Sequence, residues 1–352
     1  MIGSRFAFVL AASIAALVVS NSTIVNAAEK RYVVGTLAEG TTPFLISTAW
    51  ANAVNRHYPG HKVQVSAVGA GTRHMLLVAQ RKMDFCLWGP TPYNLLYRQI
   101  GPFRKIKNGP EMTTKVSMLF SFQIGIYHAV VYDSSGIKSY GDIKGKKVFL
   151  GPPAGVATRN MRLIVEAMTG YLPGKDYQQI KLGWGAAQQA FQDRQFDVWI
   201  TVTATPSPAV SQLALTNKIR MLGLDRSKFN HPSWKKYFRQ PGRMLADIDP
   251  KDYGRNMVNT EPVPTTGAWV GLGVRSDMPA ETVYRMMKAF WDNIGDAHAM
   301  AKQMKSLLSL QNAVTALAGD IHPGALRYYK EMGLKIGQPF RLTQADLKHR
   351  KK

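Results

Sequence analysis

"VFLGPPAGVATRNMRLIVEA" (residues 148–167) contains the pattern that decides the fold. An apolar run is followed by a turn of Gly, Pro and Ala residues and then by amphipathic sequence, which predicts a strand, a tight turn and a helix over 157–169. The turn, 151–155, carries few side chains, so its backbone can approach a neighbour closely. A helix that starts there presents unpaired N–H groups and a positive dipole end. The turn is therefore either an anion site or a plain strand-to-helix connection.

The same alternation of strand and helix runs through most of the chain. Strands are predicted at 31–36, 62–67, 84–89, around 117–132, and at 146–151, 179–184, 196–202, 219–224 and 267–276, with helices between most of them. Residues 225–262 are polar and poorly periodic, which predicts an elaborated loop with short helical pieces, and the chain from Pro279 to about Gly333 is predicted to be nearly all helical. Strands that alternate with helices indicate an α/β fold built on mainly parallel sheets flanked by helices.

Two α/β series followed by helices predict two lobes. We expect lobe 1 to comprise 28–128 and 265–352 and lobe 2 to comprise 129–264, with the chain crossing between lobes near 127–131 and 259–268. No low-complexity linker separates the two series.

Residues 1–27 show the sequence pattern of an export signal. Arg5 precedes an apolar run over 6–19, and small residues end at Ala27, so we expect a cleaved signal peptide (1–27) and a periplasmic protein. The alternative is a retained membrane anchor, for which a mainly apolar run of 14 residues is short. Cys86 is the single cysteine, which excludes an internal disulfide and a Cys-based zinc site.

The formal net charge of +23 allows a nucleic acid, an anionic membrane or an acidic ligand as partner. The basic residues are scattered, apart from 144–147 and 348–352, and no nucleic-acid-binding motif occurs. We therefore expect no nucleic-acid partner. Neither a nucleophile–base set nor a spacing of metal ligands is found, so we expect no enzyme activity, no metal and no cofactor.

Five strand ends run into Gly- or Thr-bearing turns that start helices, at 35–44, 68–75, 87–94, 150–160 and 201–210. In parallel sheets such turns gather at the carboxyl edge, where open α/β folds bind ligands. Ordinary helix capping explains any one of them alone. Together they predict a crevice lined by helix N-termini.

The stretches "VSAVGAGTRHMLLVAQRKMDFCLWG", "SSGIKSYGDIKGKKVFLGPPAG" and "IHPGALRYYKEMG" resemble the TAXI class of solute receptors, the binding subunits of TRAP transporters, over about 30–335. The resemblance implies a two-lobed type II periplasmic-binding-protein fold that performs no chemistry and holds a carboxylate ligand, such as a dicarboxylate or an amino acid, between its lobes. It also implies delivery to a sodium-driven permease. The family's usual aromatic pair, Ser-x-Glu-Asn and "GPPGSGT" patterns are replaced here, which removes the side chains that recognise an amino acid.

Arg73 and Arg159 stand at two of the altered turns, either as partners of a ligand carboxylate or as solvated arginines at helix starts. The residues that we expect to bind ligand are Thr41, Thr42, Gly71, Thr72, Arg73, Thr91, Tyr127, Gly155, Thr158, Arg159 and Thr205. We expect a monomer that captures a small organic anion. The alternatives are a sensory protein of the same fold that signals to a membrane partner, and an enzyme on the same scaffold.

Overall fold

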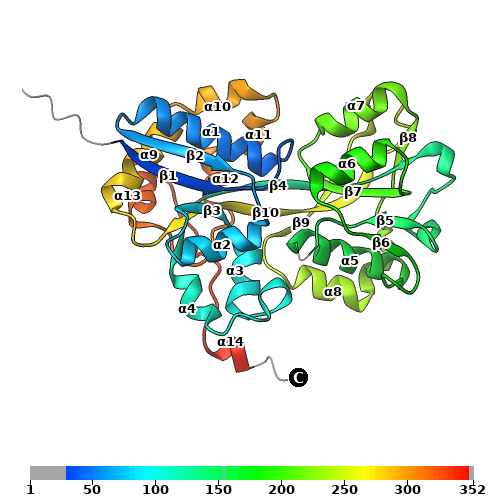
Figure 1. Cartoon of the computed structure of the whole chain (residues 1–352), viewed down its shortest axis with the longest axis horizontal. Helices are drawn as coiled ribbons and strands as arrows, with labels where there is room; N and C mark the ends of the chain where they lie inside the picture. Colours follow the sequence, from blue (N-terminus) through cyan, green and yellow to red (C-terminus); the bar gives the residue numbers. More distant parts are fainter. Residues whose placement is uncertain (1–28, 154, 349–352) are drawn as a thin grey trace, which may run out of the picture.

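The computed structural model describes residues 29–153 and 155–348 (Figure 1). The expected signal peptide, 1–27, lies outside the described residues. Two lobes lie side by side and are joined by two long strands, β4 (Val116–Tyr132) and β10 (Val263–Arg275). Within the described part of the chain, no helix is long and apolar enough to cross a bilayer.

One hydrogen-bonded sheet of ten strands passes through both lobes in the order β2-β1-β3-β10-β4-β7-β5-β6, with β8 (Ile219–Met221) on β4 and β9 (Arg243–Ile248) on β10. Each lobe contributes three mutually parallel strands to it. In lobe 1 they are β1 (Lys30–Gly35), β2 (His61–Ser66) and β3 (Phe85–Trp88); in lobe 2 they are β5 (Lys147–Phe149), β6 (Gln178–Ile180) and β7 (Val198–Thr203). This order, with the crossing strands inserted antiparallel to their neighbours, is the two-lobed type II periplasmic-binding-protein fold.

The crossing strands change partners between the lobes. β4 pairs with β10 up to Ile126 and with β7 from Ile126 onward. The register of the β4–β10 pair shifts where Trp269 lies opposite Gln123 and Ala268 lies opposite Gly125, so Ile124 bulges out of the ladder. A bulge of this kind bends the strand and re-aims its side chains.

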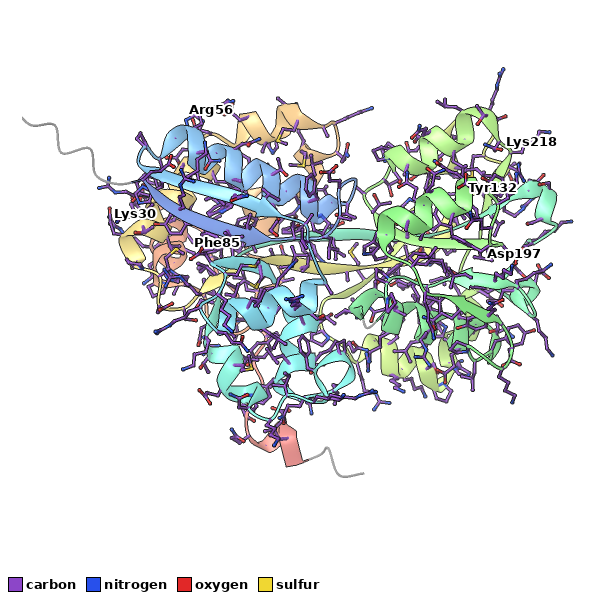
Figure 2. The ribbon with its side chains drawn as sticks, in the orientation of Figure 1. Lys30, Arg56, Phe85, Tyr132, Asp197 and Lys218 are labelled. Atoms are coloured by element: carbon purple, nitrogen blue, oxygen red, sulfur yellow. The ribbon has the colours of Figure 1, made fainter. Side chains whose placement is uncertain are left out.

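Lobe 1 buries one large core around Trp50, which is fully buried and packs its ring against Phe85, Phe120 and Phe290. Figure 2 shows Phe85 inside this lobe, whereas the exposed Arg56 lies on its outer surface. Its helices are α1 (Thr42–His57), α2 (Gly71–Ala79), α3 (Pro90–Tyr97), α4 (Gly109–Thr114), α9 (Ala280–Trp291), α10 (Ile294–Met300), α11 (Met304–Leu307), α12 (Leu310–Ala313), α13 (Pro323–Glu331) and α14 (Ala345–Lys348).

The late motif "IHPGALRYYKEMG" serves to position α13. The Nδ1 atom of His322 accepts from the Gly324 N–H and caps this helix, and Nε2 of the same ring bonds with the Met278 carbonyl. The hydroxyl of Tyr329 donates to the carbonyl of Leu119 on β4 at 2.6 Å. These bonds fasten the helical part of lobe 1 to the crossing strand.

Lobe 2 buries side chains on both faces of its sheet. Along β4, Ala129 and Val131 belong to one apolar cluster, and Val130 and Tyr132 belong to another, as the two-residue period of a strand requires. Helices α5 (Val156–Thr169) and α8 (Pro232–Phe238) cover the first face, and helices α6 (Trp184–Gln192) and α7 (Pro208–Thr216) cover the second.

The structure differs from the sequence predictions in three places. The sequence predicts an elaborated loop with short helical pieces over 225–262. The structure has such pieces there, α8 among them, but it also places strand β9 (Arg243–Ile248) in this segment, paired with β10. Only Ile248 of β9 is buried, so the strand carries no apolar alternation to detect. Strand β6 ends at Ile180, and Trp184, predicted in that strand, begins α6 instead. β8 is limited to Ile219–Met221.

Candidate ligand-binding site

A cavity of about 470 Å³ lies between the lobes, and we call it the interlobe cavity. Lobe 1 contributes Leu37 and the starts of α2 and α3, and lobe 2 contributes the starts of α5 and α6. The crossing strands contribute Ile124, at the bulge, and Trp269. The volume is in the range of about 300–1,000 Å³ that small-molecule sites have.

The helices that start at the interlobe cavity have no side-chain caps. The N-cap residues of α2, α3, α5 and α6 are Ala70, Gly89, Gly155 and Gly183, and no side chain of theirs accepts from the first turn. By contrast, α1 and α7 contribute none of the described lining residues, and they are capped by Thr41 and Ser207. First-turn N–H groups without a cap remain available to an anion, and the helix dipole favours negative charge there.

The turn in the stretch 148–167 is held by its own helix. The hydroxyl of Thr158 donates to the Pro152 carbonyl at 2.5 Å, so this side chain is engaged inside the turn. Gly151 has a φ of +114°, and a Cβ there would lie 2.8 Å from the Thr158 hydroxyl oxygen, so the turn requires glycine. Gly155 and Ala157 then face the interlobe cavity.

Arg243, at the start of β9, is the one charged side chain among the described residues that line the interlobe cavity. Its Nη2 donates to Asn160 Oδ1 at 2.6 Å, and Asn160 Nδ2 in turn donates to the Tyr127 hydroxyl at 3.0 Å. The guanidinium carbon lies 4.9 Å from the ring centroid of Tyr237. Arg243 Nε is buried and has no hydrogen-bond partner. In this network the Asn160 Oδ1 and the Tyr127 hydroxyl oxygen each accept a hydrogen bond, whereas Arg243 Nε remains a donor without a partner.

Arg159 adds a second positive charge near the interlobe cavity without lining it. Its side chain reaches across to lobe 1, where its Cδ would lie 3.3 Å from a Cβ at Gly101. One terminal nitrogen, Nη1, is buried without a partner. Burial and, second, the charge of Arg243 lower the pKa of Arg159. Neither arginine forms an ion pair with any described residue.

Five of the eleven predicted ligand-binding residues line the interlobe cavity: Gly71, Thr72, Thr91, Tyr127 and Gly155. The hydroxyl of Thr91 donates to the Pro241 carbonyl at 2.9 Å and so joins lobe 1 to the segment before β9. Whether the five contact a ligand stays a prediction.

The other six predicted residues are not among the lining residues: Thr41, Thr42, Arg73, Thr158, Arg159 and Thr205. Thr41 caps α1, and Arg73 is exposed beside Gly69. The Thr42 hydroxyl accepts from the Ala204 N–H at 3.0 Å, which joins two of the five junctions to each other. Thr205 precedes Pro206 at a cis peptide bond.

Sequence reasoning missed Arg243, Trp184 and Trp269 as lining residues. A signal existed for Trp184, because "GWG" (183–185) is another glycine-bearing helix start. No local signal existed for Arg243 or Trp269, because β9 and β10 bring them to the interlobe cavity through pairing distant in sequence. Among the residues placed in the structure, no cluster of three or more His, Cys, Asp or Glu side chains suits a metal ion.

The cavity lies between two lobes and has uncapped helix starts in its walls. The chain belongs to the NMT1-like family, whose model matches residues 34–333.

Several of the solved structures that resemble the chain in fold are of binding proteins. They include the alkanesulfonate-binding protein SsuA from Xanthomonas axonopodis pv. citri bound to MOPS (14% identity, 80% of this chain and 81% of that chain, TM-score 0.43). A TRAP periplasmic solute-binding protein from Shewanella oneidensis with bound succinate is similar at 12% identity (91% and 90%, TM-score 0.44). One from Desulfovibrio desulfuricans with bound sn-glycerol-3-phosphate is similar at 11% identity (86% and 91%, TM-score 0.46).

Proposed function

We propose that this protein is a periplasmic solute receptor of the TAXI type, which captures a small organic anion in the interlobe cavity and delivers it to a TRAP-type permease. It performs no chemistry on the solute and needs no cofactor. The observation that carries the proposal is Arg243, a lining guanidinium with a buried, unpartnered Nε and no acidic side chain among the described lining residues. Arg243 is half-buried and has no counter-charge among the described lining residues, so a bound anion supplies the missing partner.

The surroundings of Arg243 favour the same kind of ligand. The uncapped starts of α2, α5 and α6 add N–H donors from both lobes, so an anion between them is held by lobe 1 and lobe 2 together. The net charge of +23 raises the local concentration of anions around the protein. A ligand held from two sides stabilises the closed arrangement of a hinged pair of lobes.

We divide the chain at the crossing strands, with lobe 1 as 28–128 and 265–352 and lobe 2 as 129–264. The change of partner from β10 to β7 at Ile126, and the pairing of β9 with the first half of β10, support this division. The bulge at Ile124 gives the hinge a place to bend.

The proposal is tested by screening dicarboxylates, keto acids, sulfonates and other organic anions for thermal stabilisation, followed by calorimetry. A ligand at 100 times its dissociation constant stabilises by about 2.7 kcal/mol. Arg243→Gln removes charge-assisted hydrogen bonds of roughly 1.5–3 kcal/mol, so the affinity should fall about 10- to 150-fold. Arg243→Lys keeps the positive charge but loses the planar, forked set of guanidinium donors, so its affinity should lie between those of the wild type and Arg243→Gln.

Arg239→Gln is the matched control, because Arg239 is exposed, lies four residues away and is not a lining residue. The melting temperature of each unliganded variant separates lost binding from lost folding. If no anion binds, or if Arg243→Gln and Arg239→Gln bind an anion equally well, the proposed anion site is wrong. Uptake of the solute by cells that lack the gene, restored by the wild-type protein and not by Arg243→Gln, tests delivery to a permease.

A further inference from the structure

The interlobe cavity combines one cationic position with mostly apolar walls. The polar side chains among the described lining residues, apart from two indoles, are those of Thr72, Thr91, Tyr127, Asn160 and Arg243. The remaining walls are aliphatic side chains, Gly, Ala and Pro, with Trp184 and Trp269 as the largest surfaces. Such walls bury an apolar body favourably, by about 25 cal/mol for each Å² removed from water.

The side chains of the Arg243 network keep donors that no described residue accepts from. Asn160 uses its amide nitrogen on Tyr127 and its amide oxygen on Arg243, and Thr91 donates to Pro241. The Tyr127 hydroxyl accepts from Asn160, so its own proton remains to donate, and Arg243 Nε has no hydrogen-bond partner. These donors lie on one connected network, at one position in the cavity. Arg243 is the one charged side chain among the described lining residues, so the side chains of the lining offer a counter-charge to one anionic head group.

An ammonium group has no counterpart in the same lining. No Asp or Glu is among the described lining residues, and the positive charges of Arg243 and Arg159 are already uncompensated. A zwitterionic amino acid would bring a third positive charge into this region and leave it unpaired, which is costly in an apolar cavity.

We infer that the solute is an amphipathic organic monoanion, an aryl or alkyl carboxylate or sulfonate without an amino group, whose head binds at Arg243 and whose apolar body contacts Trp184 and Trp269. This inference rests on the proposed function and narrows it, since dicarboxylates and amino acids are disfavoured. The two tryptophans come from α6 and β10, so both lobe 2 and a crossing strand contact the apolar body.

Calorimetry with four matched probes tests the inference: 3-phenylpropanoate, L-phenylalanine, succinate and 3-phenylpropanamide, each at up to millimolar concentration. L-Phenylalanine differs from 3-phenylpropanoate by the ammonium group, succinate by a second carboxylate in place of the ring, and the amide by the loss of charge. We expect 3-phenylpropanoate to bind at least tenfold more tightly than each of the other three. Octanoate, an alkyl analogue, is expected to bind as well.

The variants Trp269→Leu and Trp184→Leu should weaken 3-phenylpropanoate about tenfold and leave the weak binding of succinate unchanged. Leucine is chosen because it keeps the walls of the interlobe cavity apolar. The melting temperatures of the unliganded variants show whether each variant still folds. Tighter binding of succinate or L-phenylalanine that Arg243→Gln abolishes overturns this inference and leaves the anion receptor standing. If the neutral 3-phenylpropanamide binds as tightly as 3-phenylpropanoate, both this inference and the anion-receptor proposal are overturned. If none of the probes binds, the inference is wrong, and the broader anion screen decides the receptor proposal.

Discussion

Replacing Arg159 by methionine should stabilise the unliganded protein. Arg159 carries a buried Nη1 without a partner and forms no ion pair with the described residues, and it lies within the field of Arg243. Burial and that field lower its pKa, which means that the folded state disfavours the charged guanidinium relative to the unfolded chain. Methionine retains an apolar stem against Gly101, where the Arg159 Cδ packs.

The size of the gain follows from the unpartnered donor. An unsatisfied buried donor costs roughly 1–3 kcal/mol, and more when charged. Arg159 is only partly buried, so water screens part of this cost, and we expect a gain of about 1 kcal/mol. For a protein of this size such a gain raises the melting temperature by about 1–2 °C. Anion affinity should fall in the same variant, because one positive charge leaves the neighbourhood of the site.

A double-mutant cycle with Arg243→Gln, read by chemical denaturation, isolates the repulsion between the two arginines. The gain from Arg159→Met should be smaller in the Arg243→Gln background by about 0.5 kcal/mol, because the repulsion is already absent there. Arg73→Met, an exposed position on α2, should leave stability unchanged and serves as the control. A loss of stability on Arg159→Met, or an identical gain in both backgrounds, would refute the charge argument.

Three further outcomes are expected. Thr42→Val should lower the free energy of unfolding by roughly 1–3 kcal/mol, because the buried Ala204 N–H loses its acceptor, whereas Thr42→Ser should not; equal losses in denaturant melts would contradict this. Burial lowers the pKa of His128 to about 4, so between pH 6.5 and 4 this imidazole is protonated in the unfolded chain and neutral in the folded protein. The free energy of unfolding should therefore fall by about 3 kcal/mol as the pH drops from 6.5 to 4. The His128→Gln variant should show a shallower pH dependence in the same melts, and an unchanged slope would count against the buried imidazole as its source. Burial raises the pKa of the Cys86 thiol, so iodoacetamide should label the protein only after unfolding; rapid labelling of the native form would show that Cys86 is accessible.

The two-lobed α/β fold was predictable because its signals are local. Apolar runs, glycine-bearing turns and threonine-proline helix starts depend on residues close in sequence, and the resulting alternation allows few topologies. The late motif around His322 also forms a local cap, although its contact with Met278 is long-range. The junction at 150–160 contributes lining residues to the interlobe cavity, and its turn requires glycine at position 151.

The identity of the charged residue that lines the interlobe cavity could not be predicted from such local signals. Arg73 and Arg159 stand beside turns that border the interlobe cavity, yet one is exposed and the other packs across onto Gly101. Arg243, which does line the cavity, lies in a segment without apolar periodicity. Helix starts thus indicated where the interlobe cavity would form, but they did not indicate which arginine would line it.

The sequence by itself determined the order of strands and helices, the glycine-bearing turns and the excess of positive charge, because each depends on residue type and near neighbours. Only the tertiary structure decided that Arg243, Trp184 and Trp269 share a cavity with the starts of α2 and α5. The physical reason is that β9 reaches the site by pairing with β10, and the bulge at Ile124 turns the crossing strands there. Such placement depends on hydrogen bonds between segments that are remote in the chain, which no local pattern records.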